Sequence, residues 1–337
     1  MPEATVAAGF ARSLMELAVS KGASRKALAE RSRIAPAELQ DQDNRIPFAK
    51  YVALMRAGQE LCDDPALALH FGERFDLSEL SIVGLVGGAS ESMADAFAQM
   101  NRYARLAVDV GLGPDDCYRL ERRGSSLWIV DTRRTPNNFP ELMESSFARM
   151  VCTSRRYLPG TQIVKAIHFT HAEPSYRAEY ERVFQAPVIF ASDKNALLTD
   201  DAWLKHKSPS SSRYALGVLS AHAEKLAESL DRSESTKGRV EKLLIPVLHT
   251  GDANVETISR QLGLSRQTLF RRLRAESTTF ESVLDELRHK LALHYLNKEK
   301  VSVGEAAYRV GFSDPAAFSR AFKRWTGTSP RRLRPKV

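Results

Sequence analysis

The feature that most constrains this 337-residue chain is a short helical pattern that occurs twice near its C-terminal end. In the first copy, about residues 255–276, apolar residues recur at helical spacing until Gly263, which lacks a side chain and so permits a turn. Ser265 follows as a favourable N-cap for a second helix. The apolar stripe of the first helix is Val255, Ile258 and Leu262. Two short helices around such a turn form a helix-turn-helix unit.

The second copy occupies about residues 303–326, and its Gly311 lies 48 residues beyond Gly263. Asp314 can cap the helix that follows, and Pro315 suits the first turn of that helix. Its buried stripe is predicted to be Phe318, Phe322 and Trp325. One copy alone could be a pair of ordinary surface helices. The recurrence favours two helix-turn-helix units.

The second helix of each copy has a face that points away from its core. Leu269 and Leu273 are four residues apart and must face inward, so the opposite side of that helix is exposed. This exposed face carries Gln267, Arg271 and Arg274, with Thr268 at its edge. The matching face of the second copy carries Ala316, Arg320 and Lys323. Arginine can bind guanine and glutamine can bind adenine in the major groove, so these faces suit base reading. The alternative interpretation is an ordinary surface helix with solvated arginines.

A predicted helix of about 17 residues connects the two copies and would span about 25 Å. Its apolar positions in helical register are Phe280, Val283, Leu284, Leu287 and Leu291. We expect this helix to hold both copies as one rigid body. The two exposed faces would then meet the major groove about one DNA turn, ~34 Å, apart.

Charge divides the chain into two parts. Residues 232–337 contain 21 Lys+Arg and 11 Asp+Glu, a net charge of +10, whereas residues 1–231 contain 28 and 30, a net charge of −2. A basic surplus confined to one part favours a module that binds a polyanion, although a well-solvated basic domain is the alternative. We therefore predict a near-neutral domain over residues 1–231, which the family resemblance below implies to be regulatory, and an all-α DNA-binding domain over residues 232–337. The boundary lies in a predicted break in the helical pattern at residues 231–238. Before it come a polar segment at residues 205–213 and a predicted connector helix at residues 214–230.

The first domain is predicted to be α+β or α/β. Its first hundred residues follow a helical pattern, and a β-hairpin turns at Gly124. Strands are expected at residues 162–171 and 186–192, with helices at 139–157 and 174–184. We expect an effector pocket between the strands at residues 127–130 and 163–171. Residues 24–39 have a helix-turn-helix rhythm, but acidic Glu38 favours a packing role for them.

Several other sites and locations are disfavoured. Charged residues interrupt the N-terminal segment, and the longest apolar run, residues 82–89, is far shorter than a membrane span, so we expect a cytoplasmic protein without membrane contact. Three scattered cysteines fit a reducing compartment. His168 and His171, three apart in a predicted strand, would point to opposite faces. We expect no metal and no cofactor.

The C-terminal part resembles the DNA-binding domain of the AraC/XylS family of bacterial transcription regulators. The resemblance covers about residues 238–334, through "LGLSRQTLFRRLRAES" and "VGFSDPAAFSRAFKRWTGTSPRRLR". The segment "LSIVGLVGGASESMADAFAQMNRYARL" resembles, less specifically, the arabinose-binding-type regulatory domain of the ornithine-utilisation subgroup of that family. The resemblance implies a transcription regulator with double-stranded promoter DNA, a small-molecule effector, RNA polymerase and a second copy of the chain as partners.

The resemblance also implies particular DNA contacts. The base-reading residues expected from it and from the exposed faces are Arg266, Gln267, Arg271, Arg274, Ala316, Ala317, Arg320 and Lys323. Phosphate contacts are expected at Thr268, Arg272, Ser319 and Arg324. Ser277 stands where the family commonly has glycine, which would cost up to ~1 kcal/mol if the backbone there is left-handed. The two alanines would restrict the second helix to thymine methyl groups and phosphates.

Two other functions compete with effector-controlled regulation. One is a DNA-associated alkyl-transfer enzyme, in which basic neighbours would lower the pKa of the Cys152 thiol, although a helix interior favours packing for this residue. The other is a constitutive regulator whose first domain only dimerises. We predict that the chain is not an enzyme.

Overall fold

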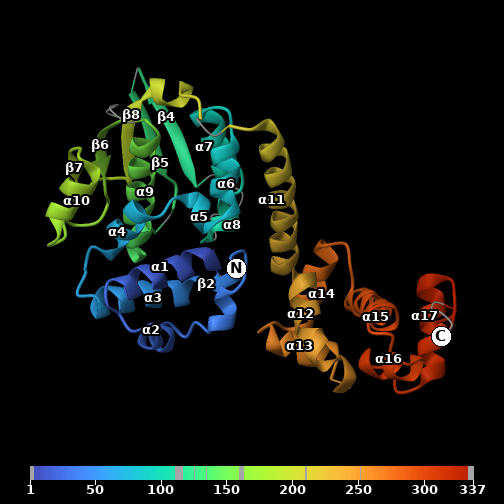
Figure 1. Ribbon diagram of the computed structural model, residues 1–337. Coiled ribbons are helices and arrows are strands. Elements are labelled where there is room, and N and C mark those ends of the chain that lie inside the picture. The colour runs from blue at the N-terminus through green and yellow to red at the C-terminus, as the bar shows by residue number, and fades with distance from the viewer. Residues whose placement is uncertain are drawn as a thin grey trace. The chain divides into compact units, whose positions relative to one another are not determined.

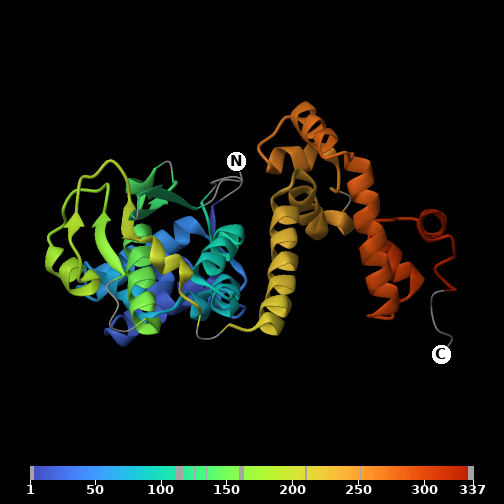
Figure 2. The same cartoon turned by 90° about the horizontal axis from the view of Figure 1, so that it is seen from above.

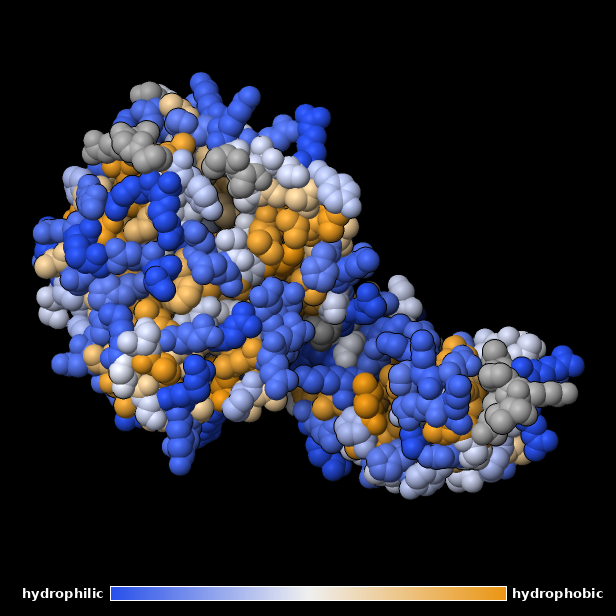
Figure 3. All heavy atoms as spheres, in the orientation of Figure 1, coloured by the Kyte–Doolittle hydropathy of each residue, from blue (hydrophilic) through white to orange (hydrophobic). Residues whose placement is uncertain are grey.

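The computed structural model describes residues 4–110, 117–124, 126–133, 135–158, 163–208, 211–250 and 252–332 (Figures 1 and 2). The chain divides into two compact units, residues 1–227 and 228–337. This division lies inside a long helix, α11 (Arg213–Glu234), close to the boundary that the charge pattern suggests. In Figure 3 the visible surface is mainly hydrophilic, and apolar side chains reach it in separate patches.

The first part of the first unit is mainly helical, as predicted. Its elements are β1 (Thr5–Ala7), α1 (Ala8–Ser20), α2 (Arg25–Ser32), η1 (Pro36–Leu39), β2 (Arg45–Pro47), α3 (Phe48–Leu61), α4 (Leu67–Arg74), α5 (Leu77–Leu80), α6 (Ile82–Ala89), α7 (Met93–Arg102), α8 (Ala104–Ala107) and β3 (Val108–Asp109). The strands form a small antiparallel sheet in the order β2-β1-β3. Residues 24–39 contain one α-helix and a 3₁₀ turn, with Leu28 and Leu39 buried, which agrees with a packing role.

A five-stranded sheet follows, in the order β4-β5-β8-β6-β7. Its strands are β4 (Tyr118–Arg123), β5 (Ser126–Asp131), β6 (Val164–His168), β7 (Val188–Ile189) and β8 (Ala196–Asp200). Between and after them lie η2 (Pro136–Asn138), α9 (Glu141–Tyr157), α10 (Arg177–Phe184) and η3 (Asp201–Lys205). Strands β4 and β5 form the predicted hairpin, and Gly124 has a φ of 62° at its turn. All neighbouring strands are antiparallel except β6 and β7, so the unit is α+β.

The core of this unit lies between the five-stranded sheet and the helices that cover one face of it, chiefly α9 (Figure 1). Alternate strand residues, among them Leu127 and Ile167, point inward and are fully buried against α9. Against these strands lies a space of about 10 Å³, lined by Ile129, Ile163 and Leu197, about enough for one water molecule. The prediction of an effector pocket between residues 127–130 and 163–171 is therefore wrong, because the side chains fill that space.

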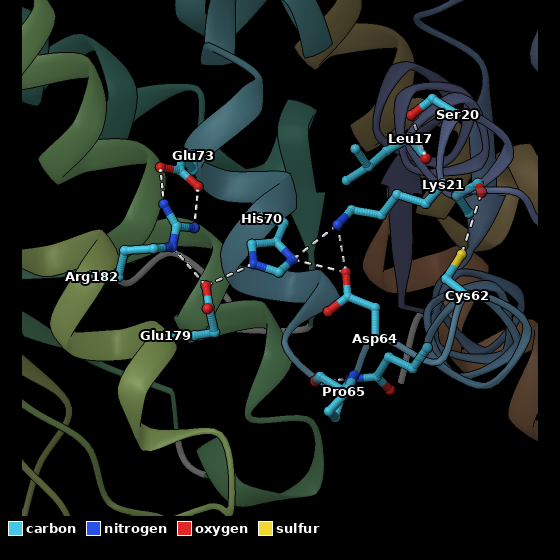
Figure 4. Close-up of polar contacts among 12 residues, drawn as sticks. Leu17, Ser20, Lys21, Cys62, Asp64, Pro65, His70, Glu73, Glu179 and Arg182 are labelled. Atoms are coloured by element: carbon cyan, nitrogen blue, oxygen red, sulfur yellow. Dashed lines mark hydrogen bonds and ion pairs between the residues drawn. The ribbon is translucent and has the colours of Figure 1, made fainter.

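A polar cluster joins the early helices to α10 (Figure 4). His70 of α4 lies between two carboxylates: its Nδ1 is 2.8 Å from Asp64 Oδ2, and its Nε2 is 2.9 Å from Glu179 Oε2. Arg182 also binds Glu179, and it donates to both carboxylate oxygens of Glu73. These bonds hold the pKa of Glu73 below its usual range. The cluster links segments more than a hundred residues apart in sequence, and its charged groups bind one another.

The second unit is entirely helical among its described residues. After α11 come α12 (Thr236–Leu244), η4 (Ile245–Thr250), α13 (Val255–Gln261), α14 (Arg266–Ala275), α15 (Phe280–Asn297), α16 (Val303–Arg309) and α17 (Pro315–Thr326). The predicted break at residues 231–238 is much shorter than expected: α11 continues to Glu234, and Ser235 caps α12 by accepting from the Gly238 amide at 2.9 Å. In the described parts of the chain, none of the helices combines the length and the apolar character needed to cross a membrane.

Candidate DNA-binding surface and ligand cavity

The first helix-turn-helix unit consists of α13 and α14. The Asn254 side chain caps α13, and the predicted cap Ser265 accepts from the Thr268 amide at 3.2 Å to begin α14. Between the helices, Gly263 has a φ of 66°, a conformation that favours glycine. The core side of the unit is closed by Ile258, Leu269 and Leu273, all fully buried. The caps and the buried side therefore fix which face of α14 is outward.

The outward face of α14 is strongly basic. Its exposed polar residues are Arg266, Gln267, Arg271, Arg272 and Arg274, and Thr268 is half-buried. Arg266 forms an ion pair with Glu256, with 2.6 Å between Nη1 and Oε1. The other three arginines form no ion pair with any described residue. Phe270 also reaches the surface here, 37% exposed, and the sequence analysis missed it because it lies outside the inward stripe.

The second unit, α16 and α17, has the same backbone plan. Ser302 caps α16, and the Asp314 carboxylate accepts from the amides of Ala316 and Ala317 at 2.9 and 3.0 Å to begin α17. These two bonds hold the pKa of Asp314 below its usual range. Gly311 occupies the turn with a φ of 81°. Phe318 and Phe322 are fully buried as predicted, whereas Trp325 is only half-buried.

The outward face of α17 differs from that of α14. Ala316, Arg320 and Lys323 are exposed, and Ala317 is half-buried. Ser319 donates to Pro315 of its own helix at 2.9 Å, and Arg324 donates to Asp285 of α15 at 2.8 Å. Two of the predicted phosphate contacts are therefore already engaged in bonds within the protein.

Three features fix the two helix-turn-helix units to each other. Helix α15 contributes Val283 and Leu287 to the core of the first helix-turn-helix unit and Leu296 to the core of the second helix-turn-helix unit. A Cβ on Gly311 would lie 2.1 Å from the main-chain oxygen of Leu248, so the turn of α16–α17 packs directly on η4.

The third feature is Arg288 of α15, which donates to the main-chain oxygens of Val310 and Gly311 at 3.0 and 3.3 Å. Its guanidinium lies 4.8 Å from the ring centre of Phe312. Burial lowers the pKa of this arginine. The predicted rigid connection between the two exposed faces therefore has a structural basis in these contacts and in α15.

The N-terminal unit, residues 1–227, contains a cavity of about 250 Å³. Helices α5 to α9 supply most of its lining, and the β4–β5 hairpin adds only the strand ends Tyr118 and Asp131. Apolar lining residues include Val83, Met93, Met100, Leu142, Met143 and Met150. Charged lining residues include Asp131, Arg133 and Arg149, the last of which is 6% exposed. The cavity combines an apolar wall with a small number of charged groups, as ligand sites commonly do.

The thiol required for alkyl transfer is not activated. Cys152 is buried, with its Sγ 4.0 Å from the Val183 oxygen, and burial raises the pKa of this thiol despite its basic neighbours. His168 ends β6, and His171 lies beyond the strand, so the predicted opposite-face arrangement within one strand is wrong. Within the described ranges, His, Cys, Asp and Glu side chains form no group of three suited to a metal ion.

Comparisons with known proteins agree with the two units. Residues 22–208 match the family described as the arabinose-binding domain of AraC transcription regulator, N-terminal, and residues 258–336 match a helix-turn-helix domain family. The chain is 29% identical over 335 residues to the ornithine utilization regulator of Pseudomonas aeruginosa, covering 96% of this chain and 95% of that protein.

Two further proteins are similar over most of their length. An HTH-type transcriptional regulator of Mycobacterium tuberculosis is 26% identical over 334 residues, covering 95% of this chain and 93% of that protein. A crystal structure of the transcriptional regulator CdpR from Pseudomonas aeruginosa is 22% identical with a TM-score of 0.43, and the match covers 92% of this chain and 96% of that chain.

Proposed function

Because the chain belongs to the AraC family of transcription regulators, we propose that α14 and α17 are the two helices with which it reads promoter DNA. The chain is a DNA-binding transcription regulator with an effector-binding N-terminal domain, and it is not an enzyme. The observation that carries the proposal is the outward face of α14, where Arg271, Arg272 and Arg274 are exposed and free of ion pairs with described residues. Such a face binds an anionic duplex rather than an apolar partner.

The contacts divide into base reading and backbone binding. We assign base reading to Arg266, Gln267, Arg271 and Arg274 on α14 and to Ala316, Ala317, Arg320 and Lys323 on α17. We assign phosphate contacts to Thr268 and Arg272 on α14 and, after release from their internal partners, to Ser319 and Arg324 on α17. The alanines of α17 offer only small apolar contacts, so α14 carries more of the sequence preference.

Control by the effector passes through α7, α8 and α11 in this proposal. Met100 of α7 and Ala104 of α8 line the cavity. Between them in sequence, Arg102 and Tyr103 donate to Glu224 of α11 at 3.1 and 3.0 Å. A ligand that shifts α7 and α8 therefore changes the hydrogen bonds that hold α11, the helix that leads into the DNA-binding unit. The change in DNA-binding free energy that the ligand causes cannot exceed the difference between its binding free energies for the DNA-binding and the non-binding conformations of the chain.

RNA polymerase and a second copy of the chain complete the proposed partners. Tyr214 and Val218 of α11 are 84% and 55% exposed, four residues apart on one side of the helix. A second copy would bring a second pair of recognition helices to the promoter. Sedimentation of the full chain with and without operator DNA measures whether two copies bind together.

The test begins by isolating the genomic fragments that the full chain retains at physiological salt. On such a fragment, Arg271→Ala should weaken binding by about 1 to 3 kcal/mol relative to the unchanged chain. Lys290→Ala is the matched control, because it removes an exposed cation from α15 of the same unit without touching α14 or α17. Equal losses of DNA affinity for the two variants would mean that α14 contributes only through its general positive charge. If the full chain retains none of the genomic fragments, the proposal is overturned.

A further inference from the structure

We propose that the cavity in the N-terminal unit binds a small carboxylic acid with an apolar body, whose carboxylate pairs with Arg149. This inference rests on the proposed effector function and names the chemical class of the effector. Its basis is a buried arginine that lines the cavity and has too few partners for its charge.

Arg149 belongs to α9, and only 6% of its surface is exposed. Its Nε donates to the main-chain oxygen of Phe75 at 3.1 Å, while its Nη2 is buried without a hydrogen-bond partner. The guanidinium lies 5.4 and 5.2 Å from the ring centres of Phe10 and Phe71. Among the residues that the structure describes, none forms an ion pair with it. A buried cation therefore faces the cavity with one neutral hydrogen bond and two aromatic faces.

The carboxylates in the cavity wall are already paired. Asp131 accepts from Arg133 Nε at 3.1 Å, and these side chains are 3% and 12% exposed. Asp76 accepts from Arg156 at 2.8 Å. Each of these carboxylates thus has its own cation. Asp76 is near enough to favour the charged form of Arg149 but forms no ion pair with it, so the guanidinium has no carboxylate of its own in the wall.

The buried carboxyl group on the same helix does not balance Arg149 either. Glu144 is 1% exposed and accepts from the hydroxyls of Tyr176 and Tyr180 at 3.1 and 2.5 Å, on the side of α10. Burial raises the pKa of this carboxyl to about 7, which weakens it as a counter-ion. It is not among the residues that line the cavity.

The energetics favour an anion from outside the chain. A buried ion without a counter-ion costs several kcal/mol, and an apolar side chain of similar size at this position would avoid that cost. A carboxylate can accept two parallel hydrogen bonds from a guanidinium, which is the geometry for which arginine is best suited. The unpartnered Nη2 supplies one of these donors.

The rest of the wall defines the body of the ligand. Val83, Leu142 and four methionines form an apolar stretch of the wall that offers no hydrogen bonds to a polyhydroxylated sugar, while hydroxyl groups from α9, among them Ser146 and Thr153, line another part. A cavity of about 150 Å³ holds benzene, so the cavity of about 250 Å³ has room for a ring or a short alkyl chain together with a carboxylate. A diamino acid would bring ammonium groups to a wall whose carboxylates are already paired. An apolar monocarboxylic acid fits these constraints best.

The test compares acids with their neutral amides on the full chain. Octanoate and 3-phenylpropionate are titrated by calorimetry beside octanamide and 3-phenylpropanamide, with L-ornithine as the zwitterionic comparison. We expect at least one acid to bind about 10-fold or more tightly than its amide, because a hydrogen-bonded charge pair is worth about 1.5 to 3 kcal/mol. No binding of either acid at its solubility limit, or equal binding of acid and amide, would overturn the assignment.

Variants locate the anion. Arg149→Met should reduce affinity for the acid about 10-fold or more and leave the amide unchanged, and Arg149→Lys should retain part of the preference for the acid. Arg155→Met is the matched control, because Arg155 also belongs to α9 and donates to the main-chain oxygens of Val183 and Phe184 but does not line the cavity. The circular dichroism spectrum of each variant reports its fold, and the comparison of acid with amide on the unchanged chain does not depend on any variant.

Failure of this inference is distinguishable from failure of effector control. If an acid binds through Arg149 but never changes operator binding, the ligand class stands and effector control by that class fails. If operator binding responds to a metabolite whose affinity is the same in Arg149→Met, effector control stands and the assignment to Arg149 fails.

Discussion

The two helix-turn-helix units share a backbone plan but present different chemistry to DNA. On α14, four arginines are exposed, and only Arg266 has an ion pair with a described residue. On α17, Arg320 and Lys323 are exposed, but Arg320 lies 3.7 Å from Asp314, Arg324 is bound to Asp285, and two alanines occupy reading positions. A repeated fold therefore does not imply repeated reading. We infer that α14 supplies most of the base discrimination and that α17 mainly fixes the register of the protein on the duplex.

The turn glycines differ in the same way. Gly263 and Gly311 both have positive φ, but no neighbouring atom lies within 4 Å of a Cβ built on Gly263. A Cβ on Gly311 would overlap the Leu248 oxygen. The first glycine serves only the turn, while the second also serves the packing between the two units.

The largest expected effect follows from that difference. Gly311→Ala should destabilise the DNA-binding unit by about 3 kcal/mol or more, because backbone strain and a main-chain overlap add. Gly263→Ala should cost about 1 to 2 kcal/mol, because it introduces only the strain of a left-handed residue. Hydrogen exchange of the amides of α16 and α17 in the full chain measures both variants. Equal costs would show that the contact with Leu248 contributes nothing.

A smaller effect separates two neighbouring cations on α17. Lys323→Ala should weaken operator binding by about 1 kcal/mol and, because it removes a base-reading cation rather than a phosphate contact, should lower the slope of log affinity against log salt by less than about 0.9. Arg324→Ala should weaken binding less, because Arg324 is already bound to Asp285 in the free protein. Gel-shift titrations over a series of salt concentrations give both quantities. A greater loss for Arg324→Ala than for Lys323→Ala would contradict this order, because the ion pair with Asp285 would then not weaken the phosphate contact of Arg324.

The smallest effect concerns the end of each recognition helix. Ser277, after α14, has a φ of 57°, whereas the left-handed residue after α17 is Gly327, with a φ of 75°. Ser277→Gly should therefore stabilise the unit by up to ~1 kcal/mol. The matched change Ser313→Gly, at a position without positive φ, should give no gain. Chemical denaturation of the full chain compares the two variants, and stabilisation by Ser313→Gly alone would contradict the backbone explanation.

The DNA-binding unit could be predicted from sequence in detail because its determinants are local. Ser265, Asp314 and the turn glycines act on residues within a few positions, and each was expected from its neighbours. Contacts across long separations could not be predicted in this way. The pair of Arg324 with Asp285 spans 39 residues, and it binds within the protein a side chain that the sequence alone offers as a free phosphate contact.

The ligand cavity escaped prediction for the same physical reason. The donation from Arg149 to the Phe75 oxygen spans 74 residues, and the cavity wall is assembled from helices α5 to α9. The strands that were expected to form the pocket instead pack their alternate side chains into a filled core. Strand β8, at the centre of the sheet, was also missed, because its five residues carry no turn signal of the kind that marked the β4–β5 hairpin.

The most direct test of the account is to measure the base preference of Arg271→Ala and Arg320→Ala on a set of operators with single base-pair substitutions. The account predicts that each variant loses about 1 to 3 kcal/mol of specific binding, that each loses base preference at its own position, and that the positions lie about one helical turn apart. It also predicts the greater loss of discrimination for Arg271→Ala. Uniform weakening on every operator by both variants would contradict it, because both arginines would then contact only phosphates.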